Sequence, residues 1–338
     1  MQRKILYIGN KLSKRGDIAT TIDTLSLLLI DEDYIVYAYS HVKNKVFRFL
    51  DMLCRTFQYR KNIDVVLIDT YSTRNFYYTV WVARLCRVLK IPYIPILHGG
   101  KLPERLKKSS RLCQRLFGGA KINVAPSLYL LKIFKEEGYA NITYIPNTIE
   151  IKNYSFLLRK EIKPKLLWVR SFSKIYNPEL ALKVVEQLME KKIDVSLCMV
   201  GPEKDGSLNQ CRELTQQKNL PITFPGKMDK KEWINLAVEY DIFINTTNFD
   251  NMPVSVIEAM ALGLPIISTN VGGLPFLIEH NKTGILVPPD NEQSFVDAIC
   301  QLLTNTILGE TLSKNARTKV EGFDWEKVKH SWFRILNE

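Results

Sequence analysis

The chain has 338 residues, of which 46% are hydrophobic and 24% are charged, and its formal net charge is +12. This length and composition predict two globular domains with packed cores, and the basic balance predicts an anionic partner: nucleic acid, a membrane surface or a phosphorylated substrate. No run approaches the roughly 20 apolar residues that a membrane-spanning helix needs, so we expect any membrane contact to be peripheral.

Cysteine and histidine usage argues against disulfides and metal sites. The six cysteines have no paired spacing and mostly lie in apolar patterns, which is typical of small core residues in a reducing compartment. The four histidines are scattered, so a protein-held zinc site is not expected. We therefore expect a protein that needs no metal or other cofactor and is cytoplasmic, either free or peripheral on the cytoplasmic face of the membrane.

The first half alternates short apolar runs with amphipathic segments. The opening run, Lys4–Gly9, is too short for a secretory signal and predicts a buried strand. Further strands are predicted at Ile35–Tyr39, Val65–Ile68, Tyr93–Leu97, Ile122–Ala125 and Ile142–Ile145, and helices at Ala19–Leu29, Phe76–Leu89 and Ser127–Glu137. Such repeated strand–helix–strand units predict a doubly wound parallel sheet.

The alternation breaks at Pro146-Asn147-Thr148, and we interpret residues 151–163 as a polar linker. The first domain then covers 1–150 and the second 164–324, followed by a helical tail at 325–338. In the second domain strands are predicted at Leu166–Val169, Val195–Val200, Ile222–Phe224, Ile242–Asn245, Pro265–Ser268 and Gly284–Val287, and helices at Glu179–Lys191, Lys230–Glu239, Val254–Leu262 and Gln293–Leu303. Two such domains predict a cleft between the carboxyl ends of their sheets.

The segment Phe249–Gly273 carries the most chemical information. Pro253 suits the first turn of a helix, and the free amides of Val254–Val256 would then form an anion site suited to a diphosphate. Asp250 lies just before this helix, and Glu258 lies about 7 Å along it, a span that suits two carboxylates accepting from sugar and ribose hydroxyls. The alternative is an ordinary capped helix, because helix N-termini bind anions in many folds.

Longer runs of sequence around this helix match a known family. The matching runs are Asp250 to Glu258 with its acidic-x7-Glu spacing, Glu258–Ala261, Gly263–Pro265, Val271–Gly273 and Lys282–Pro289. The chain resembles the retaining glycosyltransferases of family four, also called glycosyl transferases group 1. The resemblance implies the GT-B fold: two doubly wound, Rossmann-like domains facing a cleft, with the helix at 325–338 packing back on the first domain. The family usually has Glu at the position of Asp250, which is one methylene shorter.

The resemblance also implies roles for individual residues. Arg170 and Lys174 would contact the donor phosphates, Asp250 and His98 would position the donor sugar, and Glu258 would bind the ribose. The expected catalytic residues are thus His98, Arg170 and Asp250. The remaining expected donor contacts are Gly9, Gly201, Lys227, Asn251, Met252, Pro253 and Val254.

Structural alternatives stand beside several of these roles. A lone histidine such as His98 is more often structural, Arg170 and Lys174 could be a solvated strand-end pair, and glycines at strand ends are common in any doubly wound fold. The run Asp31-Glu32-Asp33 formally matches the Asp-x-Asp metal motif of the other glycosyltransferase fold. Because it lies at a predicted turn between a helix and a strand, we interpret it as a solvated acidic turn.

Two basic segments bear on the partner. One contains Lys101, Arg105, Lys107, Lys108, Arg111 and Arg115, and the other contains Lys43, Lys45, Arg48, Arg55, Arg60 and Lys61, interleaved with Phe47, Phe49, Leu50, Leu53 and Phe57. Basic helices with an apolar face are typical of anionic membrane surfaces. The alternative is that these apolar residues face the core and the cations are solvated. Nucleic acid is not expected, because no recognition module appears.

We therefore expect a retaining glycosyltransferase. It would move a hexosyl or N-acetylhexosaminyl group from a nucleotide-sugar donor to a saccharide or lipid-linked saccharide acceptor, in surface polysaccharide or glycolipid synthesis. Two alternatives remain. A nucleotide-sugar epimerase of the same fold would change the donor without any acceptor, and a catalytically inactive membrane-associated scaffold is left open by Asp250 in place of Glu.

Overall fold

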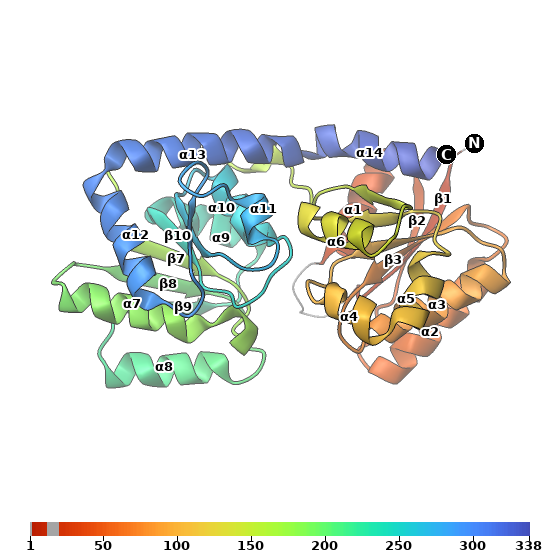
Figure 1. Ribbon diagram of the computed structural model, residues 1–338, viewed down its shortest axis with the longest axis horizontal. Coiled ribbons are helices and arrows are strands. Elements are labelled where there is room, and N and C mark those ends of the chain that lie inside the picture. Colours follow the sequence, from red (N-terminus) through yellow and green to blue (C-terminus); the bar gives the residue numbers. More distant parts are fainter. Residues whose placement is uncertain (1, 12–19) are drawn as a thin grey trace. The chain divides into compact units, whose positions relative to one another are not determined.

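A computed structural model describes residues 2–11 and 20–338 (Figure 1). The chain divides into two compact units, of which unit 1 is Met1–Asn147 with Trp325–Glu338 and unit 2 is Thr148–Asp324. Each unit has a six-stranded sheet in which all pairs are parallel. Within the described part of the chain, no helix combines the length and the apolar character needed to cross a bilayer.

Unit 1 has the strand order β2-β1-β3-β4-β5-β6. Its strands are β1 (Lys4–Ile8), β2 (Ile35–Tyr39), β3 (Val65–Thr70), β4 (Tyr93–Leu97), β5 (Asn123–Ala125) and β6 (Ile142–Tyr144). Its helices are α1 (Thr21–Asp31), α2 (Lys45–Tyr59), α3 (Phe76–Val88), α4 (Leu102–Lys108), α5 (Ser110–Phe117), α6 (Leu128–Glu136) and α14 (Trp325–Asn337). The strand order reverses between β1 and β3, which is where doubly wound sheets bind ligands.

The central strands of unit 1 are buried on both faces, as their nearly continuous apolar sequences predict. Every residue of β3 is buried. On one face, residues such as Leu6 and Ile68 pack under α2, α3, α4, α5 and α6, whereas on the other face Tyr7 and Leu67 pack under α1 and α14. Figure 1 shows α2, α3 and α5 side by side below this sheet.

Helix α14 belongs to unit 1, although unit 2 precedes it in the chain. It adds Trp325, Val328, Trp332, Ile335 and Leu336 to the core that contains Tyr7 and Leu67. The acidic turn after α1 contributes to this docking, because Glu32 Oε1 accepts hydrogen bonds from Trp325 Nε1 at 3.1 Å and Lys329 Nζ at 2.9 Å. The predicted packing of the C-terminal helix on the first domain is confirmed.

Unit 2 has the strand order β12-β11-β10-β7-β8-β9, which reverses between β7 and β10. Its strands are β7 (Lys165–Val169), β8 (Ser196–Val200), β9 (Ile222–Gly226), β10 (Ile242–Asn245), β11 (Ile266–Thr269) and β12 (Ile285–Val287). Its helices are α7 (Pro178–Glu190), α8 (Ser207–Gln217), α9 (Lys230–Leu236), α10 (Val254–Ala261), α11 (Leu274–Leu277), α12 (Glu292–Thr304) and α13 (Thr306–Val320). Two six-stranded parallel sheets with flanking helices confirm the predicted doubly wound fold class.

The segment interpreted as a linker, residues 151–163, packs on unit 2 instead of connecting the units freely. Arg159 is only 6% exposed, and its guanidinium donates to the carbonyl oxygens of Tyr240, Ala237 and Leu262 at 2.8, 2.9 and 3.1 Å. Ile162 is also buried, in the core under α7 and α12. The polar composition of this segment predicted a linker, but Arg159 forms its hydrogen bonds within unit 2. The boundary between the units in this part of the chain lies after Asn147.

Candidate functional site

The switch point of unit 2 brings Arg170 and Asp250 into contact. Arg170 directly follows β7 and Asp250 lies in the loop after β10, so both stand at the carboxyl edge of the sheet where its order reverses. Arg170 Nη2 forms an ion pair with Asp250 Oδ2, and the two side chains are only 18% and 15% exposed. The Arg170 guanidinium also lies 4.4 Å from the ring centroid of Tyr176, and burial lowers its pKa.

Arg170 retains one donor for a ligand. Its Nε is buried and has no hydrogen-bond partner among the residues that the structure describes. A buried N–H without a partner costs free energy unless a ligand or water accepts from it. An anion at this edge of the sheet could accept from Nε while the other side of the guanidinium stays on Asp250.

Glycine backbone holds both residues of this pair in place. The Gly273 amide donates to the carbonyl of Asp250 at 2.9 Å, and a Cβ on Gly273 would overlap the carbonyl oxygen of Asn251. A Cβ on Gly201 would likewise overlap the carbonyl oxygen of Arg170. The glycines after β8 and β11 are therefore required by close backbone approach, which explains their place in the sequence pattern.

Helix α10 begins directly after this loop without a side-chain cap. Its N-cap is Pro253, which has no hydrogen-bonding side chain, so the amides of Val254–Val256 depend on some other acceptor. The hydroxyl of Ser255 is buried without a hydrogen-bond partner among the described residues. Asn251 and Met252, both at most 6% exposed, wedge the loop against the body of unit 2. The helix start thus offers several unused donors beside Arg170.

Glu258 lies in the second turn of α10 and is already engaged. Its Oε1 accepts from the hydroxyl of Tyr154 at 2.7 Å and from Lys230 Nζ at 2.9 Å, and its side chain is 5% exposed. Burial and the neighbouring Glu258 raise the pKa of Tyr154 well above its usual range, so this hydroxyl stays a donor. Tyr154 comes from the segment interpreted as a linker, so that segment also supports the site.

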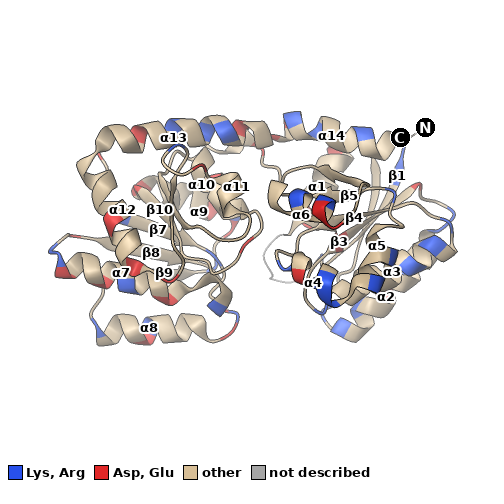
Figure 2. Cartoon of the chain, viewed as in Figure 1, with Lys and Arg blue, Asp and Glu red and all other residues tan. Residues whose placement is uncertain are grey.

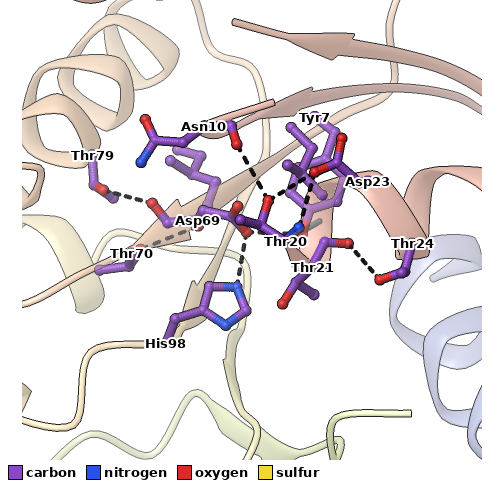
Figure 3. Close-up of polar contacts among 12 residues, drawn as sticks. Tyr7, Asn10, Thr20, Thr21, Asp23, Thr24, Asp69, Thr70, Thr79 and His98 are labelled. Carbon is purple, nitrogen blue, oxygen red and sulfur yellow. Dashed lines mark hydrogen bonds and ion pairs between the residues drawn. The ribbon is translucent and has the colours of Figure 1, made fainter. Parts of the chain in front are cut away.

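A second polar cluster lies at the switch point of unit 1 (Figure 3). Asp69, at the end of β3, accepts with Oδ1 from the Tyr7 hydroxyl at 2.8 Å and contacts His98 Nε2 at 2.8 Å. The Asp69 side chain is fully buried and that of His98 is 9% exposed. Burial and the Asp69 carboxylate raise the pKa of Tyr7 well above its usual range, so Tyr7 donates this hydrogen bond.

Gly9, like His98, is a predicted site residue that lies in this cluster. A Cβ on Gly9 would overlap Oδ2 of Asp69, an oxygen that has no hydrogen-bond partner among the described residues. Tyr71 packs on His98 with 5.5 Å between the ring centroids. Burial raises the pKa of Tyr71 too, so the cluster contains neutral hydroxyls around one carboxylate. In the segment between β1 and α1, residues 12–19 lie outside the described residues.

Asp69 was missed by the sequence analysis. The sequence feature that could have identified it is a single acidic residue near the carboxyl end of the largely apolar strand Val65–Thr70. A charge buried in such a strand needs a partner, because an unpaired buried charge is costly. The partner is His98, which is 29 residues away in the chain but directly follows the neighbouring strand β4, and the register of β3 and β4 brings the two residues close.

Two predicted cations stand apart from these contacts. Lys174 is exposed in a short 3-10 helix, where its backbone amide donates to Asp205 Oδ2 at 3.0 Å. Lys227 is also exposed, between Gly226 and the start of α9. The structure therefore joins Arg170 to Asp250, and Gly9 to His98 through Asp69, but shows no side-chain contact that would fix Lys174 to this pair. No cluster of three potential metal ligands occurs within residues 2–11 and 20–338.

Comparison with known proteins places the second half of the chain in a family. The family model for glycosyl transferases group 1 matches residues 151–319. A curated relative is spore coat protein SA of Bacillus subtilis strain 168, which is 29% identical over 52% of this chain and 49% of its own length. The chain spans about half or less of the length of the curated relatives that it matches first.

Solved structures share the fold over nearly the whole chain. Sucrose-phosphate synthase of Thermosynechococcus elongatus has a TM-score of 0.84 at 17% identity, with 99% of this chain and 98% of that chain covered. HepE of Anabaena, solved with UDP-glucose, has a TM-score of 0.80 at 16% identity, with 99% and 100% covered. At these identities the likeness establishes a common architecture for each unit.

Proposed function

Because this chain belongs to the glycosyl transferases group 1 family, we propose that it transfers a sugar from a nucleotide-sugar donor to an acceptor hydroxyl, with retention of anomeric configuration. The observation that carries this proposal is the Arg170–Asp250 ion pair beside the uncapped start of α10. A carboxylate, a guanidinium and free amides within one loop match what a sugar and a diphosphate require together. HepE, which shares the fold, was solved with UDP-glucose, so a uridine donor is the first to test.

Donor binding is divided between the loop and the helix. The diphosphate accepts from Arg170 Nε and Ser255 Oγ, which have no partner among the described residues, and from the amides of Val254–Val256 at a helix start that has no side-chain cap. Lys174 and Lys227, both exposed, add positive charge as the donor docks. These contacts strengthen as the nucleoside diphosphate departs, because negative charge develops on its leaving oxygen.

Asp250 in unit 2 is assigned to a hydroxyl of the donor sugar. Asp250 Oδ1 accepts from its neighbouring amide, that of Asn251, at 2.8 Å, which fixes the carboxylate plane for the sugar. In unit 1, the Asp69 carboxylate accepts from Nε2 of His98, so Nδ1 remains as the acceptor for a sugar hydroxyl. Glu258 uses Oε1 for Tyr154 and Lys230, and its Oε2 is assigned to the ribose.

No metal or other cofactor enters this mechanism. The leaving diphosphate is neutralised by Arg170 and the start of α10, and its oxygen takes the proton from the attacking acceptor hydroxyl as the bond to the sugar breaks on the same face. The acceptor is proposed to be a saccharide or a lipid-linked saccharide in surface polysaccharide or glycolipid synthesis. The six cysteines are free thiols, as a reducing cytoplasm would keep them.

The test is a panel of nucleotide sugars. Purified protein is screened by thermal shift with each donor, and release of free nucleoside diphosphate is followed with and without a saccharide acceptor. One donor should raise the melting temperature and release its diphosphate slowly by hydrolysis, with faster release when an acceptor is added. Conversion of the donor to an epimer without release would favour an epimerase, and no shift with any donor on folded protein would favour a non-catalytic role.

A further inference from the structure

The positive charge of the chain is concentrated in one part of unit 1. Residues 43–117 contain 16 Lys and Arg but only four Asp and Glu, so their net charge of +12 equals that of the whole chain and the remainder is balanced. This stretch forms α2, α3, α4 and α5, which pack on the same face of the sheet. Figure 2 shows the Lys and Arg residues along these helices.

Helix α2 exposes an apolar stripe among these cations. Its Met52 and Thr56 face the core, whereas Phe47, Leu50 and Phe57 are 64%, 48% and 50% exposed. Steps of three and seven residues place these three side chains on one side of the helix. They therefore do not serve the core of unit 1, and solvent-exposed aromatic residues in this arrangement mark an interaction surface.

A basic groove lies between α3 and α5 in the same helical layer. Its volume is about 400 Å³, and its lining includes Arg84, Arg87, Arg115, Trp81 and Leu112. No acidic residue of the described chain lines it. Arg87 is fixed there, since it donates to the hydroxyl of Tyr93 at 3.0 Å and to the carbonyl of Arg115 at 2.8 Å.

Trp81 and Arg84 form the outer wall of this groove. The Arg84 guanidinium lies 5.0 Å from the Trp81 ring centroid, and Trp81 is 45% exposed. Neither Arg84 nor Arg115 has an acidic partner for its side chain among residues 2–11 and 20–338. A tryptophan beside free guanidinium groups suits the interface of a bilayer, where the ring enters the headgroup layer and the cations meet phosphate.

We propose that α2, α3 and α5 form a docking surface for an anionic phospholipid bilayer. A lipid phosphate occupies the groove between Arg84, Arg87 and Arg115, while the α2 stripe and Trp81 enter the headgroup layer. A nucleic acid would engage the cations but would leave the apolar stripe exposed, so the bilayer is the better match. The inference does not depend on the proposed transfer reaction, because vesicle binding needs no donor.

Trp81 provides a direct readout of docking. The other four tryptophans, Trp168, Trp233, Trp325 and Trp332, are at most 5% exposed, so acrylamide quenching of the native protein reports mainly on Trp81. Vesicles of equal parts phosphatidylcholine and phosphatidylglycerol should co-sediment the protein, shift its emission to the blue and protect it from acrylamide. Vesicles of phosphatidylcholine alone should do none of this. Trp81→Phe should remove the emission change while the protein still co-sediments.

Two pairs of charge-reversal variants distinguish the contribution of the groove to vesicle binding from the contribution of the net charge. Arg84→Glu with Arg115→Glu should weaken binding to the anionic vesicles by about tenfold or more, because both the phosphate site and the surface charge are lost. Lys183→Glu with Arg212→Glu makes the same change in charge on exposed positions of unit 2 and should leave binding unchanged. Phe47→Ser with Phe57→Ser should weaken binding without changing the charge. Circular dichroism and thermal unfolding show that each variant is folded.

Four results would overturn the inference. These are no co-sedimentation with anionic vesicles, binding without protection of Trp81, equal weakening by the two charge-reversal pairs, and tighter binding to single- or double-stranded nucleic acid than to vesicles at the same salt. Each leaves the transfer proposal standing, because donor stabilisation and diphosphate release are measured on protein free of vesicles.

Discussion

Asp69 holds the ring of His98 through a 2.8 Å contact between Oδ1 and Nε2, although neither residue belongs to a recognisable sequence motif with the other. The same oxygen accepts from Tyr7, so one buried carboxylate on β3 contacts a side chain of β1 and a side chain that directly follows β4. His98 is thereby held in one tautomer, with Nδ1 as its free nitrogen. Asp69 is a positioning residue in this arrangement, since it acts on the proposed sugar contact through His98.

Asp69→Asn should lower transfer by about tenfold to a hundredfold, because a hydrogen bond to a charged group contributes about 1.5–3 kcal/mol. The amide has nearly the same shape, so the protein should remain folded. Steady-state kinetics of Asp69→Asn, His98→Ala and the double variant measure the coupling of the two residues. The double variant should be no slower than His98→Ala, and losses that multiply would show that Asp69 acts by another route.

Arg170→Ala and Asp250→Ala should each abolish most transfer. Arg170→Ala removes the donors assigned to the diphosphate and should also remove the thermal stabilisation by donor. Asp250→Asn should bind donor but turn over slowly, because a neutral amide no longer holds Arg170 as an ion pair. Full activity in both alanine variants, with circular dichroism unchanged, would contradict the assignments.

Gly273→Ala should displace the Asp250 loop and reduce donor affinity, because its Cβ would overlap the carbonyl of Asn251. Gly322→Ala is the matched control, since a Cβ at that position meets nothing within 4 Å. We expect Gly273→Ala to raise KM for the donor by about tenfold or more and to lower stability by about 1–3 kcal/mol. Equal behaviour of the two variants in donor titration and urea unfolding would refute this role of the glycine.

Stability should fall as the pH rises above about 10, the usual pKa of tyrosine. The pKa of Tyr154 is raised in the folded state, so above this pH the unfolded chain loses a proton that the folded chain retains, and unfolding becomes more favourable. Tyr7 and Tyr71 act in the same direction. Tyr154→Phe should make the slope of unfolding free energy against pH shallower between about pH 10 and 11 in urea titrations. An unchanged slope would show that Tyr154 does not hold its proton.

The strands could be predicted from sequence because they are buried on both faces. Runs such as Val65–Ile68 and Ile242–Ile244 are apolar throughout, and each of the twelve predicted strands lies within two residues of an observed one. Helix α8 escaped prediction because only Ser207, Leu208 and Cys211 are buried in it, too few to produce a clear apolar period. Helix α13 escaped for a similar reason, since its mixed sequence buries small residues such as Gly309 and Ala316.

Site residues that lie close together in the chain could be predicted from sequence. Contacts between residues that lie far apart in the chain could not. Asp250 and Glu258 stand on one loop and helix, so their spacing carried the information. The contact of Tyr154 with Glu258 spans 104 residues, and that of Asp69 with His98 depends on strand pairing. Both partners lie in segments whose composition gave no hint of a polar contact, one in a supposed linker and the other in an apolar strand.

The place of α14 bears on how the chain folds during synthesis. Unit 2 is one uninterrupted stretch, Thr148–Asp324, inserted between the two parts of unit 1. The core beneath Tyr7 and Leu67 includes the tryptophans and isoleucine of α14, which are synthesised after unit 2. Unit 2 can therefore complete its core first. Until α14 is synthesised, the face of the unit 1 sheet that contains Tyr7 and Leu67 is only partly covered. We therefore expect unit 2 to complete its core before unit 1, the reverse of the usual order in which the N-terminal domain folds first.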